Sequence, residues 1–103
     1  MRNRPPSGGV HIYLFAYDIS ERRRWRRVFK LLSRAGEWTQ LSTFLVRQTP
    51  ARREGLESAL RRVLVTGEDR LLIVDLGPEA QARGRLAGLE PISLPEPPRT
   101  VIL

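Results

Sequence analysis

The sequence predicts an α+β domain of the ferredoxin-like class, a βαββαβ sandwich whose antiparallel sheet carries both helices on one face. The chain has 103 residues, a length suited to one hydrophobic core. Runs rich in β-branched and aromatic residues alternate along it with segments of helical apolar spacing. Ser42 and Thr43 allow a break in the middle apolar run, which would divide it into two short strands.

The first half of this pattern is a strand followed by a basic amphipathic helix. Residues 10–18, VHIYLFAYD, are almost continuously apolar, as expected of a central strand. In residues 20–36 the apolar side chains recur at spacings of three and four, which predicts a helix with one buried stripe. The stripe consists of Trp25, Val28, Phe29, Leu32 and Ala35. We expect Gly36 to end this helix in the left-handed conformation.

The second half repeats the pattern. Residues 38–49 predict the strand pair, and Pro50 is suited to the first turn of a helix that we expect to run to about Thr66. Its apolar stripe is Leu56, Ala59, Leu60, Val63 and Leu64. Gly67 follows, and RLLIVDL at 70–76 has the length and composition of a buried strand.

The ends of the chain differ in composition from the domain at 10–76. Residues 1–9 are rich in proline and glycine, so we expect a disordered tail. Residues 77–90 are interpreted as a linker, and 91–103 as an edge-strand segment with the short apolar pieces ISL and TVIL between prolines. Such a piece can cover an open sheet edge of its own chain or of a second copy. We favour the second copy, hence a homodimer with exchanged C-terminal segments.

The charge of the chain points to a polyanionic partner. Its net charge is +7, and Lys30 is the only lysine, so the other basic residues are arginines. Because arginine presents a planar fork that matches phosphate, nucleic acid is the partner we expect; a merely solubilising surface is the alternative. The candidate nucleic-acid-binding residues lie on the outer face of the first helix: Arg22, Arg23, Arg26, Arg27 and Lys30.

The absence of cysteine excludes disulfides, thiolate metal sites and cysteine nucleophiles. The apolar runs are too short to span a membrane, and the N-terminal residues lack the apolar stretch of a signal peptide. We therefore expect a cytoplasmic protein without a membrane partner.

Asp18, at the end of the first strand, is a carboxylate in an otherwise basic stretch of the chain. Alone it would bind Mg²⁺ poorly, because this cation needs several oxygen ligands and takes one or two carboxylates together with substrate phosphate. A local role remains open: Asp18 could cap the next helix, with Glu21 completing a capping box, and Ser20 is a rival cap. For Asp75 we expect a solvated strand end, and for His11 a packing role.

Several short motifs in fixed order resemble one family. YDIS at 17–20 follows the first strand, and a basic helix with Arg27-Val28 and Leu31-Leu32 ends near Gly36. TQLSTF at 39–44 comes next, with its polar residues Gln40 and Ser42 before Phe44. Together with the strand after a proline-bearing linker, this resembles the CRISPR-associated adaptation protein family, the small ferredoxin-like subunit that partners the adaptation integrase.

The resemblance implies a homodimeric, Mg²⁺- or Mn²⁺-dependent endonuclease acting on RNA or double-stranded DNA. It implies that Asp18 of each copy lies near the twofold axis as the metal-binding and catalytic residue, with Tyr17 beside it as a second catalytic-site residue. The chain departs from the family pattern at Leu45, where a glutamate is usual, and at Thr43, where valine is usual. Trp25 and Trp38 stand at positions that are commonly basic.

Two functions from different classes remain. One is the metal-dependent endonuclease; the other is a non-catalytic DNA-binding hub that bridges integrase dimers in the CRISPR adaptation complex. A generic RNA-binding domain ranks below both, because the aromatic motif of such domains is absent.

Overall fold

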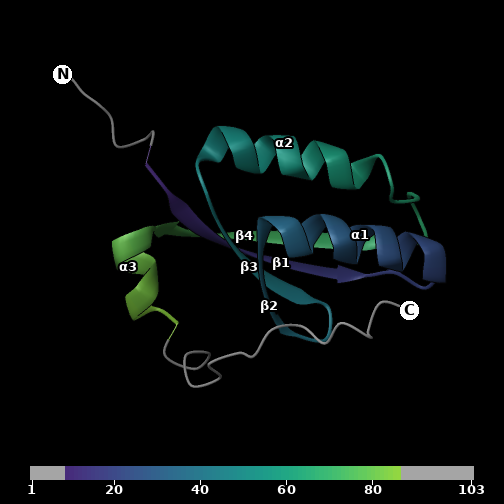
Figure 1. Ribbon diagram of the computed structural model, residues 1–103, viewed down its shortest axis with the longest axis horizontal. Coiled ribbons are helices and arrows are strands. Elements are labelled where there is room, and N and C mark those ends of the chain that lie inside the picture. The colour runs from purple at the N-terminus through teal and green to yellow at the C-terminus, as the bar shows by residue number, and fades with distance from the viewer. Residues whose placement is uncertain (1–8, 87–103) are drawn as a thin grey trace.

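The computed structural model describes residues 9–86 and forms one sheet with helices beside it (Figure 1). In chain order the elements are β1 (His11–Asp18), α1 (Arg22–Ala35), β2 (Gly36–Gln40), β3 (Thr43–Gln48), α2 (Pro50–Arg61), β4 (Arg70–Pro78) and α3 (Glu79–Gly84). The strands are arranged β2-β3-β1-β4, and each neighbouring pair is antiparallel. The predicted βαββαβ order and antiparallel sheet are confirmed.

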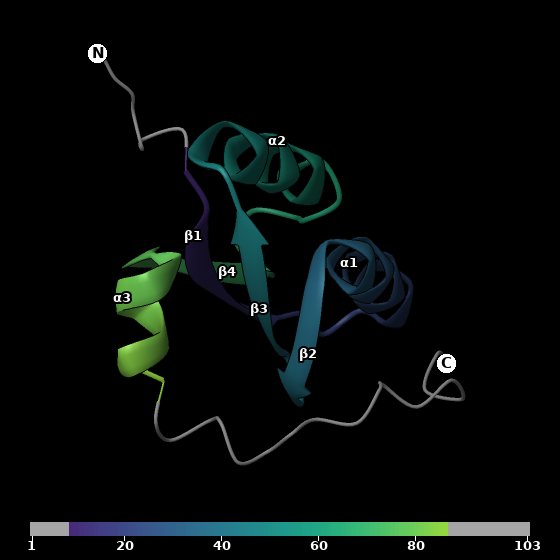
Figure 2. The ribbon, with the colours of Figure 1, turned by 60° about the vertical axis from the view of Figure 1, so that its left-hand side comes forward.

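Helices α1 and α2 cover the same face of the sheet, as Figure 2 shows. Tyr13, Phe15 and Tyr17 of β1 point toward these helices and are buried with Phe44 and Val46 of β3. The helices complete this core with Val28, Phe29, Leu32 and Leu60, and Val63 joins it from the turn after α2. Each helical stripe predicted from apolar spacing therefore contributes its central residues to one core.

The other face of the sheet is apolar and is not covered by α1 or α2; we call it the open face. Side chains alternate along a strand, so Leu14 and Ala16 point away from the core residues of β1. Their cross-strand partners share that face: Leu45 and Val74 lie opposite Leu14, and Leu72 lies opposite Ala16. Leu72 is 57% exposed. The open face consists of Leu14, Ala16, Leu45, Leu72 and Val74.

Gly36 corrects one expectation. Its φ of −155° is extended, so it does not end α1 in the left-handed conformation; instead it begins β2. A Cβ at this position would overlap the carbonyl oxygen of Leu45 and would lie 2.7 Å from Cγ2 of Val46. The backbones of β2 and β3 come so close at this position that a side chain would collide with β3, so glycine is required here.

The two predicted strands of the middle run are present, separated by a turn at Leu41 and Ser42. Leu41 has a φ of 40°, and the indole Nε1 of Trp38 donates to its carbonyl oxygen at 2.9 Å. Helix α2 ends at Arg61, earlier than the Thr66 we expected. A turn follows in which Gly67 has a φ of +92°, a conformation suited to glycine.

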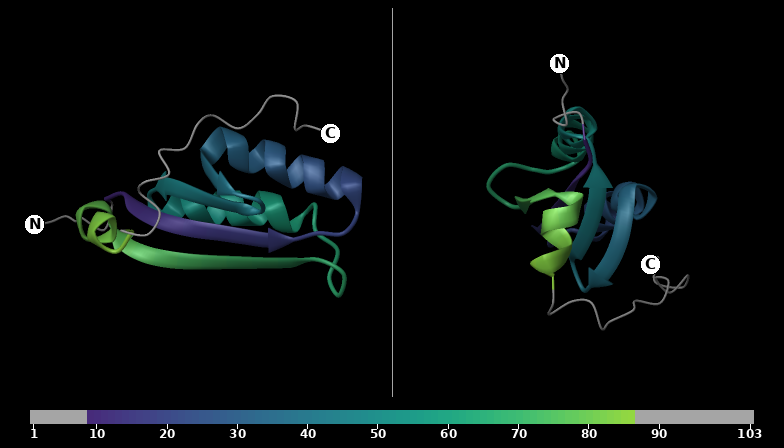
Figure 3. Two further views of the ribbon diagram at one scale, coloured as in Figure 1. Left: turned by 90° about the horizontal axis from the view of Figure 1, so that it is seen from below. Right: turned by 90° about the vertical axis from the view of Figure 1, so that its left-hand side faces the viewer.

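The interpretation of 77–90 as a linker was wrong for its first part. Strand β4 continues to Pro78, and α3 follows directly, with Ala82 fully buried. Glu79 fastens this helix, since its amide donates to the carbonyl of Val10 and its carboxylate accepts from Nε of Arg47 at 2.7 Å. Figure 3 shows α3 at the opposite end of the sheet from the β1–α1 junction.

Other predictions fall outside the described residues. These are the tail at 1–8, the end of the linker from residue 87, and the edge segment at 91–103 with ISL and TVIL. Strand exchange and the boundary between the linker and the edge segment at residues 90 and 91 therefore remain predictions. Within residues 9–86, none of the helices has the length and apolar character needed to cross a membrane.

Candidate functional site

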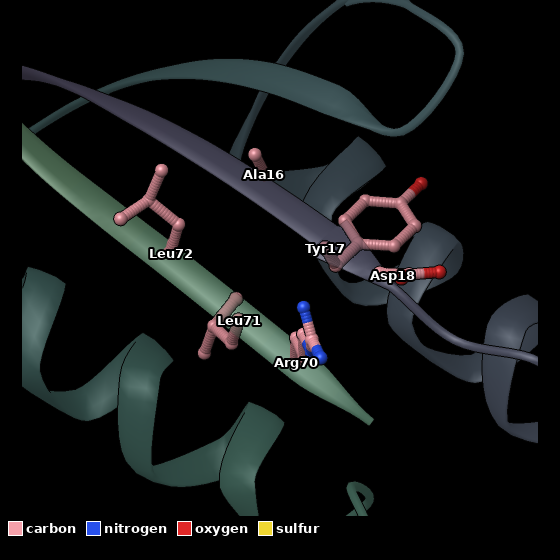
Figure 4. Close-up of a pocket in the computed structure, with 6 residues that line it drawn as sticks. All are labelled: Ala16, Tyr17, Asp18, Arg70, Leu71 and Leu72. Atoms are coloured by element: carbon pink, nitrogen blue, oxygen red, sulfur yellow. The ribbon is translucent and has the colours of Figure 1, made fainter. Parts of the chain in front are cut away.

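Asp18 lies at the rim of an open pocket at the end of β1. It is the last residue of that strand, is exposed, and stands directly opposite Arg70, the first residue of β4. The pocket has a volume of about 530 Å³ and is lined by Ala16, Tyr17, Asp18, Arg70, Leu71 and Leu72 (Figure 4). Because Leu72 and Ala16 belong to the open face, the carboxylate stands where that face ends.

The structure excludes the local capping role that was an alternative for Asp18. Glu21 is the N-cap of α1, and its Oε1 accepts a hydrogen bond from the amide of Arg24 at 2.9 Å. This backbone hydrogen bond is the main cause that lowers the pKa of Glu21. Neither Asp18 nor Ser20 caps the helix. The Asp18 carboxylate has no hydrogen-bond or ion-pair partner among the described residues.

Tyr17 is a buried neighbour of that carboxylate. Its ring faces the core, where it stacks on Phe44 with centroids 6.3 Å apart. Burial raises the pKa of Tyr17 to about 12, and the Ser42 side chain lowers it by a smaller amount. Ser42 does not reach hydrogen-bond geometry, so the buried hydroxyl lacks a partner among the described residues. A neutral, enclosed phenol can shape the pocket but cannot serve as a base at neutral pH.

A single chain does not supply a complete metal site within residues 9–86. No group of three or more histidine, cysteine, aspartate or glutamate side chains gathers there. The donor set nevertheless fits one hard cation if a second copy contributes, because Mg²⁺ accepts a pair of carboxylates and completes its shell with water and phosphate oxygens. Asp18 is the carboxylate that lines the pocket, and it is exposed and not engaged by another described side chain.

Asp75 and His11 form a separate pair on the helix-covered face, at the other end of β1. His11 Nδ1 lies 2.9 Å from Oδ1 of Asp75, which also accepts from the amide of Gly77 at 2.8 Å. Partial desolvation opposes these hydrogen bonds, but they outweigh it and lower the pKa of Asp75. Asp75 is thus more than a solvated strand end, and it does not join Asp18 in a site.

The basic outer face of α1 is present as predicted. All five candidate residues are exposed, and no ion pair joins any of them to a carboxylate in the described part of the chain. They are Arg22, Arg23, Arg26, Arg27 and Lys30. Trp25, which replaces a commonly basic position, stacks on Phe29 at 5.1 Å and extends the core instead. The first of these five positively charged residues, Arg22, follows Asp18 by four positions.

Arg24 plays a different part, which the sequence did not reveal. Its Nε donates to Oδ2 of Asp69 at 2.7 Å, and its Nη2 donates to Oε1 of Glu68 at 3.1 Å. The Asp69 side chain is fully enclosed and also accepts from the amide of Val65. These contacts join α1 to the loop before β4. Arg24 differs from the arginines around it only because the folded chain brings that loop next to its side chain.

Comparison with known proteins decides the family. Residues 11–83 match the family model for CRISPR associated protein Cas2. The chain belongs to the Cas2 family. This confirms the resemblance drawn from YDIS, the basic helix and TQLSTF.

Curated Cas2 relatives cover most of the domain. The CRISPR-associated endoribonuclease Cas2 of Geobacter sulfurreducens is 38% identical over 79 residues, covering 77% of this chain and 83% of the relative. CRISPR-associated endoribonuclease Cas2 1 of Rhodospirillum rubrum is 42% identical over 72 residues, covering 70% of this chain and 71% of the relative.

Solved structures agree on the fold. A hypothetical protein of Thermus thermophilus is 36% identical with a TM-score of 0.63, covering 65% of this chain and 82% of its own. A crystal structure of cas2 is 30% identical with a TM-score of 0.60, covering 65% of this chain and 75% of its own. Streptococcus pyogenes Cas2 is 27% identical with a TM-score of 0.57, covering 60% and 81%.

Proposed function

We propose that this Cas2 chain acts in CRISPR adaptation as a homodimeric, metal-dependent endonuclease, and that Asp18 from each copy forms its catalytic centre. The observation that carries the proposal is Asp18 itself, an exposed carboxylate at the rim of a pocket, with no structural partner among residues 9–86. We also propose that the protein acts in the cytoplasm, the location expected from the sequence, because that is where it would meet its nucleic-acid substrate.

The open face supports a second copy as the partner. Solvent exposure of contiguous apolar surface is unfavourable, and two such faces related by a twofold axis would cover each other. Asp18 stands at the edge of this face, so the same axis can bring two carboxylates near one another. Two carboxylates held close together repel each other, and a bound cation relieves this repulsion, so a pair of Asp18 side chains near the axis would favour metal binding.

In that dimer, the two Asp18 carboxylates would hold Mg²⁺ or Mn²⁺, which supplies an activated water and neutralises charge on the phosphate. The remaining roles belong to the chain itself. The five exposed bases of α1 would bind the nucleic-acid backbone through phosphate, without reading sequence. Tyr17 would close one wall of the pocket with a neutral side chain.

RNA is the substrate that the comparisons favour, because the Geobacter and Rhodospirillum relatives are named endoribonucleases. Double-stranded DNA remains the other substrate in the proposal, since its backbone offers the same phosphate groups and the proposed contacts do not read the bases.

A second candidate function is a structural hub that binds duplex DNA and bridges integrase dimers without cleaving. The observation that favours it is the basic face of α1, which is complete within one chain, whereas the metal site is not. Under this alternative, Asp18 would be dispensable for DNA binding and for docking to the integrase.

Cleavage by wild type and Asp18→Asn separates the two functions. Single-stranded RNA and duplex DNA would be incubated with Mg²⁺, Mn²⁺ or EDTA, and binding would be measured on the same samples. We expect metal-dependent cleavage that falls about a hundredfold or more in Asp18→Asn while binding persists. Glu54→Gln is the matched control, because Glu54 is an exposed carboxylate on α2. Absence of cleavage in every metal would favour the hub.

A further inference from the structure

Arg70 is an unassigned cation inside the Asp18 pocket. It is exposed, lies opposite Asp18 in the β1–β4 register, and lines the same 530 Å³ pocket. Figure 4 shows its guanidinium beside the end of β1 that carries Tyr17 and Asp18. Directly opposed residues of an antiparallel pair have Cβ atoms about 5 Å apart, so both side chains address the same small volume.

The two acidic residues just before Arg70 in the chain do not neutralise it. Glu68 and Asp69 both turn to Arg24, at 3.1 and 2.7 Å. The Asp69 carboxylate is completely enclosed by this contact and by the amide of Val65. From the sequence GEDR alone, Arg70 would be expected to form an ion pair with one of its two acidic neighbours. In the structure both carboxylates bind Arg24 of α1 instead, so neither neutralises Arg70.

The Arg70 side chain also forms no ion pair or hydrogen bond with Asp18 or with another residue in the part of the chain that the structure describes. Its planar fork of N–H donors is therefore available, and such a fork matches two oxygens of one phosphate. The neighbouring walls, Leu71, Leu72 and Ala16, are apolar and offer no competing acceptor side chain.

We propose that Arg70 is the phosphate-binding residue of the Asp18 site, donating a pair of hydrogen bonds to a backbone phosphate that lies over this pocket. The inference rests on the proposed function and deepens it. Asp18 supplies a negative group on one side of the pocket and Arg70 a positive group on the other. Arg70 can therefore bind a phosphodiester while the Asp18 carboxylate lies next to that same phosphodiester. The expected ligand is a nucleic-acid phosphate without base specificity.

The test measures binding without cleavage. In an Asp18→Asn background, the affinity for single-stranded RNA and duplex DNA would be compared for Arg70, Arg70→Lys and Arg70→Ala over a range of salt concentrations. We expect Arg70→Ala to weaken binding about tenfold and to reduce the slope of log affinity against log salt by about one. Arg70→Lys should keep the slope and recover only part of the affinity, because a point charge replaces the fork.

Arg52→Ala is the matched control. Arg52 is exposed on α2, has no ion pair with a described carboxylate, and lies outside the pocket. We expect it to change affinity by no more than about twofold. Thermal unfolding would verify that the variants are folded, which the exposure of Arg70 predicts.

The outcomes separate this inference from the nuclease proposal. If Arg70→Ala binds like Arg52→Ala while wild type cleaves in a metal-dependent way, the phosphate role of Arg70 is wrong and the nuclease stands. If wild type never cleaves but Arg70→Ala still loses affinity in the Asp18→Asn background, the nuclease proposal fails and Arg70 remains a phosphate-binding residue, as the hub would need.

Discussion

The guanidinium of Arg24 clasps the carboxylate of Asp69, with Nε to Oδ2 at 2.7 Å and Nη2 to Oδ1 at 3.2 Å. This pair joins the first turn of α1 to the residue immediately before Arg70. Since α1 begins four residues after Asp18, the same contact ties together the two chain segments that border the pocket. Neither Arg24 nor Asp69 lines the pocket itself.

Asp69→Asn should therefore lower stability, and the loss should depend on pH. The hydrogen bond from Arg24 is the main cause that holds the pKa of Asp69 below its usual value of 3.8. A depressed folded-state pKa gives stability that is present above pH 3.8 and is lost as the pH falls through the folded-state value. We expect the midpoint of thermal unfolding to fall by several degrees at neutral pH, and the difference from wild type to shrink in acid.

Glu54→Gln serves as the control for this series, because Glu54 is exposed and lies 3.9 Å from Arg53. Its unfolding temperature should match that of wild type within about a degree. A loss in Asp69→Asn that stays constant from neutral pH to strong acid would contradict the assigned ion pair.

Tyr17→Phe should retain cleavage within about fivefold of wild type. A phenol whose pKa is raised to about 12 stays protonated across the range in which cleavage would be measured, so it cannot take a proton from water. Because its hydroxyl lacks a partner within residues 9–86, removing it should leave stability unchanged or slightly higher. The measurement is a pH–rate profile. An activity loss as large as that of Asp18→Asn, at unchanged unfolding temperature, would show that the hydroxyl participates directly.

Leu72→Glu should separate the two copies. Leu72 is 57% exposed on the edge strand of the open face, and a charge there would have to be desolvated in the dimer. We expect the dissociation constant to rise about a hundredfold, measured by light scattering during size-exclusion chromatography. Leu41→Asn is the control, since Leu41 is 81% exposed at the β2–β3 turn and its positive φ suits asparagine. A Leu72→Glu protein with wild-type mass would place the interface elsewhere.

Neutralising part of the α1 row should weaken nucleic-acid binding uniformly. Arg26→Gln combined with Arg27→Gln keeps helix propensity and removes two exposed charges. We expect the salt dependence to become shallower by about one unit for each phosphate that the variant no longer binds. Arg52→Gln with Arg62→Gln on the α2 side is the matched pair, and it should have a smaller effect. Equal effects of the two pairs would mean that binding follows total charge rather than α1.

Apolar spacing was enough to predict the layers of this fold. Val28, Phe29 and Leu32 recur with the period of a helix and are buried, while the run from 70 to 76 has the length of a strand. Single-residue geometry was not predictable in the same way. Gly36 looked like a helix end because glycine is common there, but the contact that requires it is with β3, which follows later in the chain.

The site was predictable only in part. Motif order identified Asp18, and charge spacing identified the basic face of α1. Sequence could not tell which of the neighbouring arginines was committed to structure, because Arg24 meets Asp69 across 45 residues. Nor could it find Arg70, whose place opposite Asp18 depends on the register of β1 and β4.

In the proposed dimer, one Asp18 from each of two copies makes a single catalytic centre. The most direct test of this pairing is RNA cleavage by wild type co-refolded with increasing fractions of Asp18→Asn, at constant total protein. If both carboxylates are required, an equal mixture should retain about one quarter of the wild-type rate, because only that fraction of dimers carries two wild-type copies. A rate that falls in proportion to the wild-type fraction, to about one half, would mean that each chain acts alone and would contradict the paired site.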